Sequence, residues 1–146
     1  MATLVLRLCG GLELSVDGVP VEPSLGSKTL ALLAFLRLER GPHRREALAS
    51  LLWGEYEDEK AKTSLRQALT RLRDAVGDLI TGDRITAGLT GDLSCDVSEF
   101  EVLAASDPKA ALAIDVPSFL AGVSLRACRD FDDWAAAKRM ALVERY

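Results

Sequence analysis

A run of basic, hydroxyl and amide side chains between residues 60 and 73 is the part of the sequence best suited to contact another molecule. Five residues of this run are basic and none is acidic. At about 100° per residue on a helical wheel, Leu65, Leu69 and Leu72 fall within one narrow arc, which predicts a helix anchored by that stripe. The opposite arc carries Lys60, Thr63, Gln67, Thr70 and, just beyond the run, Asp74, and the shoulders carry Lys62, Ser64, Arg66, Arg71 and Arg73. The candidate DNA contacts are all of these except Asp74.

Such a face has the chemistry to read double-stranded DNA. An α-helix fits the major groove, where arginine can donate two hydrogen bonds to guanine and glutamine can pair with adenine. Lysine and arginine on the shoulders of the helix can reach phosphates. The alternative is a basic face that meets only solvent, because a basic amphipathic helix is not a specific signal. A hairpin predicted just after the helix, with Arg84 at its tip, favours DNA, since this side chain can enter the neighbouring minor groove.

The elements around this helix have the order of a winged helix-turn-helix, an α+β fold. Apolar residues alternate over residues 4–8 and 12–16, so we expect a small antiparallel sheet at the N-terminus. Helices are predicted from Ser27 to about residue 40, over about 44–52 and over about 59–76, with Asp58 as the cap of the third. A hairpin wing over about 79–87 and a short β-like run at 93–96 follow.

The last third of the chain is helical again, with apolar residues at helical spacing in three stretches. We therefore divide the chain into a winged-helix domain, residues 1–96, and the N-terminal part of a helical domain, residues 97–146. No Gly, Pro or cap ends the last helix, so we expect the natural protein to continue past Tyr146.

The overall charge argues weakly against a nucleic-acid partner, but its distribution does not. The formal net charge is −4, yet residues 26–90 hold eleven basic and nine acidic side chains, and residues 91–146 hold six and ten. Three widely spaced cysteines and a single histidine do not fit a zinc site and suit a reducing cytosol. Without a signal peptide, membrane span, nucleotide-binding motif or catalytic grouping, we expect a cytoplasmic protein that is not an enzyme and needs no cofactor.

Several stretches resemble the Streptomyces antibiotic regulatory protein family of transcriptional activators. They occur in the order found in the OmpR-type winged helix of that family, and they are Leu25–Lys28, Leu30–Leu36, Arg45–Ala49, Leu51–Trp53 and Ser64–Arg73. Residues 96–100 and 119–122 are similar to the start of the bacterial transcriptional activation domain that follows in these proteins. His43 departs from the pattern, because the family often has Ser or Thr at this position.

The resemblance implies sequence-specific activation of transcription, with the third helix in the major groove of direct repeats and two protomers side by side. It implies that residues 97–146 open a tetratricopeptide-like helical stack. It also implies that the loop between the second and third helices faces RNA polymerase, and this loop comprises Trp53, Gly54, Glu55, Tyr56, Glu57 and Asp58.

Two alternatives within this interpretation stay open. The acidic balance of the chain suits a winged helix with little or no DNA affinity that docks a protein partner instead. Trp53 can be a core residue or a platform on which a base stacks, and we favour the core, because it closes the end of the second helix.

Overall fold

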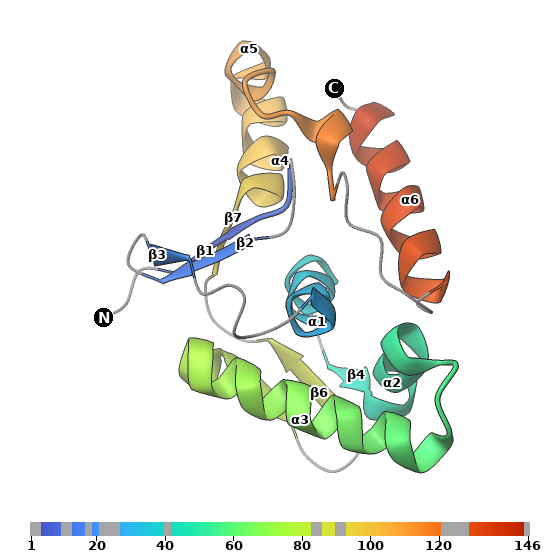
Figure 1. The fold of residues 1–146 in the computed structure, drawn as a ribbon. Helices are drawn as coiled ribbons and strands as arrows, with labels where there is room; N and C mark the ends of the chain where they lie inside the picture. The colour runs from blue at the N-terminus through green and yellow to red at the C-terminus, as the bar shows by residue number, and fades with distance from the viewer. Residues whose placement is uncertain are drawn as a thin grey trace.

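The structure is a computed structural model that describes residues 4–9, 13–16, 19–20, 27–39, 42–82, 86–89, 93–120 and 129–144. Two small sheets and a set of helices surround a central helix, α1 (Ser27–Leu38), as Figure 1 shows. The architecture is the mixed α/β one expected from the sequence, and the following paragraphs give the bounds of its elements.

The N-terminal sheet has four strands in the order β3-β2-β1-β7. β1 (Leu4–Arg7), β2 (Glu13–Val16) and β3 (Val19–Pro20) are antiparallel neighbours, as the alternating pattern predicted. β7 (Ser94–Cys95) pairs with β1 in parallel, so the expectation of a purely antiparallel sheet is corrected to a mixed one. Parallel pairing needs a long connection between the two strands, and the whole helical region between β1 and β7 supplies it.

The second sheet has the strand order β4-β6-β5 and is antiparallel throughout. β5 (Ile80–Gly82) and β6 (Thr86–Leu89) are the two arms of the predicted hairpin. β4 (His43–Arg44) is a two-residue strand that the sequence did not reveal, and it pairs with β6 through His43 and Ala87. The tip between the arms, residues 83–85 with Arg84, lies outside the described residues.

Two further helices follow α1, and both lie within one residue of their predicted bounds. They are α2 (Arg45–Trp53) and α3 (Asp58–Val76). Asp58 is the first residue of α3 and not its cap, since Glu57 precedes the helix in an extended conformation without a side-chain cap hydrogen bond. At the other end, Gly77 adopts a φ of 66° and donates its N–H to the carbonyl of Arg73, and a 3₁₀ turn (Gly77–Leu79) leads into β5.

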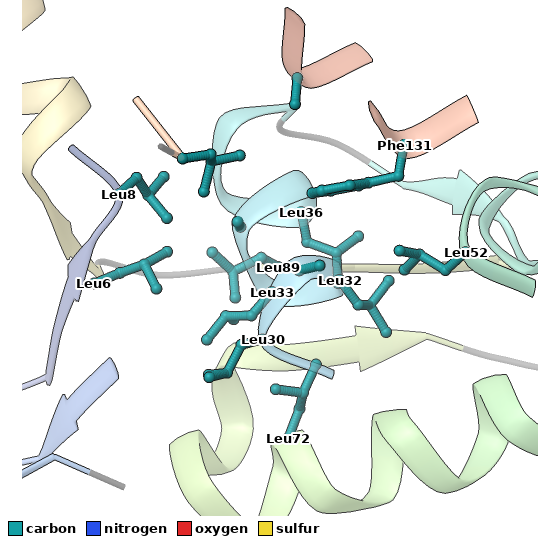
Figure 2. Packing of buried hydrophobic residues seen from close by; sticks show 14 of the residues in the cluster. Leu6, Leu8, Leu30, Leu32, Leu33, Leu36, Leu52, Leu72, Leu89 and Phe131 are labelled. Carbon is teal, nitrogen blue, oxygen red and sulfur yellow. The ribbon is translucent and has the colours of Figure 1, made fainter. Parts of the chain in front are cut away.

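α1 lies at the centre of the hydrophobic core because apolar side chains cover most of its circumference. Leu32, Leu33 and Leu36 of this helix are fully buried. Figure 2 shows that Leu8, which follows β1, and side chains from five other elements point toward α1. The latter are Leu6 from β1, Leu52 from α2, Leu72 from α3, Leu89 from β6 and Phe131 from the C-terminal helix α6 (Arg129–Glu144). Residues from both ends of the chain therefore share one buried cluster.

The C-terminal third contains α4 (Asp96–Ser106), the short α5 (Pro108–Ala111), a 3₁₀ turn (Val116–Ser118) and α6. The carboxylate of Asp96 accepts hydrogen bonds from the backbone N–H groups of Leu8 (3.0 Å) and Cys9 (2.9 Å), at the end of β1. The N–H of Leu120 donates to the carbonyl of Leu8 at 2.6 Å. These bonds tie the start of α4 and the turn before α6 to the N-terminal strand.

α6 is joined to the end of α1 by one aromatic side chain. The indole N–H of Trp134 donates to Glu39 at 3.0 Å, and its ring meets that of Phe35 edge-on, with 5.0 Å between the centroids. The ring of Phe35 also lies 5.2 Å from the ring of His43 in β4. Contacts of α6 with α2 and with the end of α1 cross residue 96, where we divide the chain into two domains. That division stays a prediction.

No helix in the described part of the chain is long and apolar enough to cross a membrane. Within the same residues, no group of three or more His, Cys, Asp or Glu side chains is placed to hold a metal ion.

Cys9 should react slowly with alkylating reagents, because the reactive form of a cysteine is the thiolate. Burial, followed by the negative charge of Asp96, raises the pKa of the Cys9 thiol to about 12. At pH 8.5 we therefore expect iodoacetamide to modify Cys9 at least about a hundredfold more slowly in the folded protein than in urea. Peptide mass spectrometry over a time course measures this ratio, and equal rates in both states would contradict the assigned environment.

Candidate nucleic-acid interface

The inner face of α3 is the apolar stripe that the helical wheel predicted. Its side chains are no more than 7% exposed, and they are Ala61, Leu65, Ala68, Leu69 and Leu72. This stripe packs on α1 and α2. Burial of three leucines fixes the rotation of α3 about its own axis, and thereby determines which side chains point outward.

The outer face of α3 carries the polar side chains predicted to contact DNA. Thr63 and Ser64 are half-buried at the edge of this face, and the exposed residues are Lys60, Lys62, Arg66, Gln67, Thr70, Arg71 and Arg73. The hydroxyl of Thr70 donates to the carbonyl of Arg66 at 3.0 Å, which leaves its oxygen free to accept a further bond. The structure thus brings together nine of the ten predicted DNA-contacting residues, and the tenth, Arg84, lies outside the described part.

The cations on this face are largely unpaired. Lys62 lies 3.9 Å from Glu59, and both side chains are so exposed that the pair contributes little. Among the described residues, no carboxylate lies within ion-pair distance of Arg66, Arg71 or Arg73. Three guanidinium groups, each with five N–H donors, are therefore available to an anionic partner.

The acidic C-terminal third does not cover this face. In Figure 1, α4, α5 and α6 lie on the opposite side of α1 from α3, with the core between them. α6 therefore lies across α1 from α3, and among the described residues no ion pair joins a carboxylate of α6 to a cation of α3.

The base of the wing is fixed by buried residues of both hairpin arms, since Ile80, Ala87 and Leu89 are at most 4% exposed. Gly82 ends the first arm at a position where no larger residue fits, because a Cβ there would lie 2.4 Å from the carbonyl oxygen of Thr86. The hairpin starts directly after α3 and its 3₁₀ turn, so the wing extends from the C-terminal end of the helix that carries the basic face.

The turn predicted to face RNA polymerase is only partly available at the surface. Trp53 is 5% exposed and packs in the core, which confirms the interpretation of Trp53 as a core residue. Its side chain is therefore not accessible to a partner. Tyr56 is half-buried. The side chains of the turn that remain exposed are those of Glu55, Glu57 and Asp58, with Gly54 exposed beside them.

Lys28 is a further candidate site residue, which the sequence pattern did not single out. Its ammonium group lies 4.7 Å from the ring centroid of Tyr56, and that of Lys60 lies at the same distance from the same ring. The sequence contains one indication that Lys28 lies at the surface, since it is the single charged residue between Ser27 and Leu36 in a mostly apolar helix. Only the fold shows that it lies beside the start of α3.

Comparison with known proteins finds similarity to a transcriptional regulatory protein. No protein-family model matches the chain. The transcriptional regulatory protein EmbR of Mycobacterium tuberculosis and that of Mycobacterium bovis are each 30% identical over 102 aligned residues, which cover 64% of this chain and 26% of the relative. The chain therefore matches only about a quarter of the length of these relatives.

The fold agrees with this similarity. The solved structure of Mycobacterium tuberculosis EmbR in complex with a low-affinity phosphopeptide matches with a TM-score of 0.67 and 25% identity. The match covers 99% of this chain and 42% of that one. In both sequence and winged-helix-like fold, the chain is thus similar to part of the transcriptional regulatory protein EmbR.

Proposed function

We propose that this chain is the DNA-binding part of a transcriptional activator of the Streptomyces antibiotic regulatory protein family. Residues 1–96 form its OmpR-type winged helix, and residues 97–146 form the N-terminal part of a tetratricopeptide-like bacterial transcriptional activation domain. The similarity to EmbR, a transcriptional regulatory protein, supports this assignment independently of the motifs in the sequence.

A single observation carries the proposal: the outer face of α3 exposes basic side chains and Gln67 while its leucines are buried in the core. Arg66, Arg71 and Arg73 on this face have no carboxylate partner among the described residues. This face enters the major groove, where Arg66, Gln67 and Arg71 can donate to base edges. Lys62 and Arg73 on its margins neutralise phosphates, and so does Lys60 at the N-terminal end of the face. The wing reaches the adjacent minor groove through Arg84.

Activation requires contacts beyond DNA. Two protomers bind side by side on direct repeats, and the exposed carboxylates of the turn between α2 and α3, Glu55, Glu57 and Asp58, face RNA polymerase. The protein binds DNA and RNA polymerase in the cytoplasm. The phosphopeptide in the solved EmbR complex is a ligand of that protein.

Selection of bound sequences from a random pool of duplex DNA tests the proposal. We expect enrichment of one motif, repeated in direct orientation, and binding that weakens with added salt by several log units of affinity per log unit of salt. A chain that retains no duplex DNA at 0.05 M salt would contradict the proposal. That outcome would favour the alternative, a winged helix that docks a protein partner.

A further inference from the structure

The contacts of Tyr56 describe a second cationic site beside the start of α3. The ring lies in the turn between α2 and α3, and the Tyr56 N–H donates to the carbonyl of Trp53 at 3.0 Å, which fixes the turn. Two ammonium groups lie 4.7 Å from its centroid, that of Lys28 from α1 and that of Lys60 from α3. Lys28 also lies 5.9 Å from the ring of Trp53, which is itself part of the core.

The two ammonium groups have no carboxylate within ion-pair distance in the described part of the chain, although Glu55, Glu57, Asp58 and Glu59 are close in the sequence. Among the described residues, the ion pairs within 4.0 Å join Lys62 to Glu59 and Lys138 to Glu39, so neither Lys28 nor Lys60 has a carboxylate partner at this distance. Attraction to the face of an aromatic ring, worth about 0.5–1 kcal/mol at an exposed site, offsets part of the repulsion between the two ammonium groups. The N–H donors of both groups remain available to an anion.

We infer that Lys28 and Lys60, oriented by the ring of Tyr56, form a clamp for one phosphate of the DNA backbone at the N-terminal end of α3. The inference rests on the proposed function and extends its footprint from α3 to α1. A duplex phosphate fits the site because Lys60 continues the row of cations on the outer face of α3, so that both sites meet the same strand. Tyr56 is then a positioning residue for DNA and not a contact to RNA polymerase.

A phosphate clamp predicts a particular change in DNA binding when one of its lysines is removed. Backbone contacts carry no sequence information, so losing one weakens binding to every duplex equally. Each lost phosphate contact also reduces the dependence of log K on log salt by about 0.9. A contact to a base would instead change which sequences are preferred.

The test compares Lys28→Ala with the unchanged protein on two duplexes of equal length, one carrying the selected motif and one unrelated to it. We expect Lys28→Ala to reduce the salt slope by about 0.9 on both, which makes its relative loss of affinity about three- to fourfold smaller at 0.2 M than at 0.05 M salt. Lys109→Ala, which removes an exposed cation from α5 on the far side of the molecule, is the matched control and should leave the slope unchanged.

Variants of the ring separate its role from that of the charges. Tyr56→Phe keeps the aromatic face and should bind as the unchanged protein does, whereas Tyr56→Leu should lose affinity on both duplexes. Thermal melting of each variant establishes that it is folded. An unaltered slope for Lys28→Ala, or a loss confined to the selected motif, would overturn the clamp while DNA binding by α3 stands. Failure of the unchanged protein to bind either duplex would overturn the proposed function and the clamp with it.

Discussion

Phe131→Ala is expected to lower the free energy of unfolding by about 3–5 kcal/mol, the usual cost of replacing a buried phenylalanine by alanine. Phe131 is 1% exposed and is the side chain by which α6 reaches the core around α1 (Figure 2). Its ring also lies 5.4 Å from that of Trp134, so its removal leaves a cavity and loosens the joint between α6 and α1. Urea unfolding followed by circular dichroism measures the change.

A control in the same helix isolates the effect of burial. Met140 is 68% exposed, so Met140→Ala should change the free energy of unfolding by no more than about 0.5 kcal/mol. Similar losses for the two variants would mean that α6 is not packed on the core as described.

The two tryptophans of the chain then test whether residues 1–96 and 97–146 unfold separately. Trp53 reports on α2 and Trp134 on α6, and variants with phenylalanine at one position give proteins with a single fluorophore. Since both residues contact one hydrophobic cluster, we expect the two transitions to coincide in urea. A transition at Trp134 that precedes the one at Trp53 would show two independent units.

The elements that could be predicted from the sequence are those with a long, regular pattern. α3 has nineteen residues, and its apolar stripe from Ala61 to Leu72 covers about three turns, so its bounds and its inward and outward faces followed from the wheel. The alternation of residues 4–8 and 12–16 was equally informative for β1 and β2.

Elements of two residues carry no period, and their partners are distant in the chain. β4 was missed for this reason, because His43–Arg44 has no pattern of its own. β7 lies within the β-like run predicted at 93–96, but its parallel pairing with β1 was not predicted. The hydrogen bonds from Leu8 to Asp96 join residues 88 positions apart, and the contacts of Lys28 with Tyr56 depend on how three helices meet. Such features belong to the tertiary structure, so one sequence could not reveal them.

Replacing both Arg66 and Arg71 by alanine should have the largest effect on DNA binding. Both guanidinium groups are exposed on the outer face of α3, without a carboxylate partner among the described residues, so they lose no internal bond when DNA replaces water. A bidentate contact to a base is worth about 1–3 kcal/mol, so we expect the selected duplex to bind on the order of a hundredfold more weakly to the double variant. Titration in an electrophoretic mobility assay at fixed salt measures this loss.

The control for that experiment removes the same charge from elsewhere on the surface. Lys109 on α5 and Arg129 at the start of α6 are exposed and belong to helices other than α3. The Lys109→Ala/Arg129→Ala variant loses two positive charges, as the α3 variant does, so the two have the same net charge. If general attraction between a cationic protein and DNA caused the loss, both double variants would weaken binding alike. If α3 contacts bases in the groove, only the Arg66→Ala/Arg71→Ala variant binds more weakly. Its loss of affinity is then larger for the selected duplex than for an unrelated one, because contacts to bases stabilise only the complex with the preferred sequence.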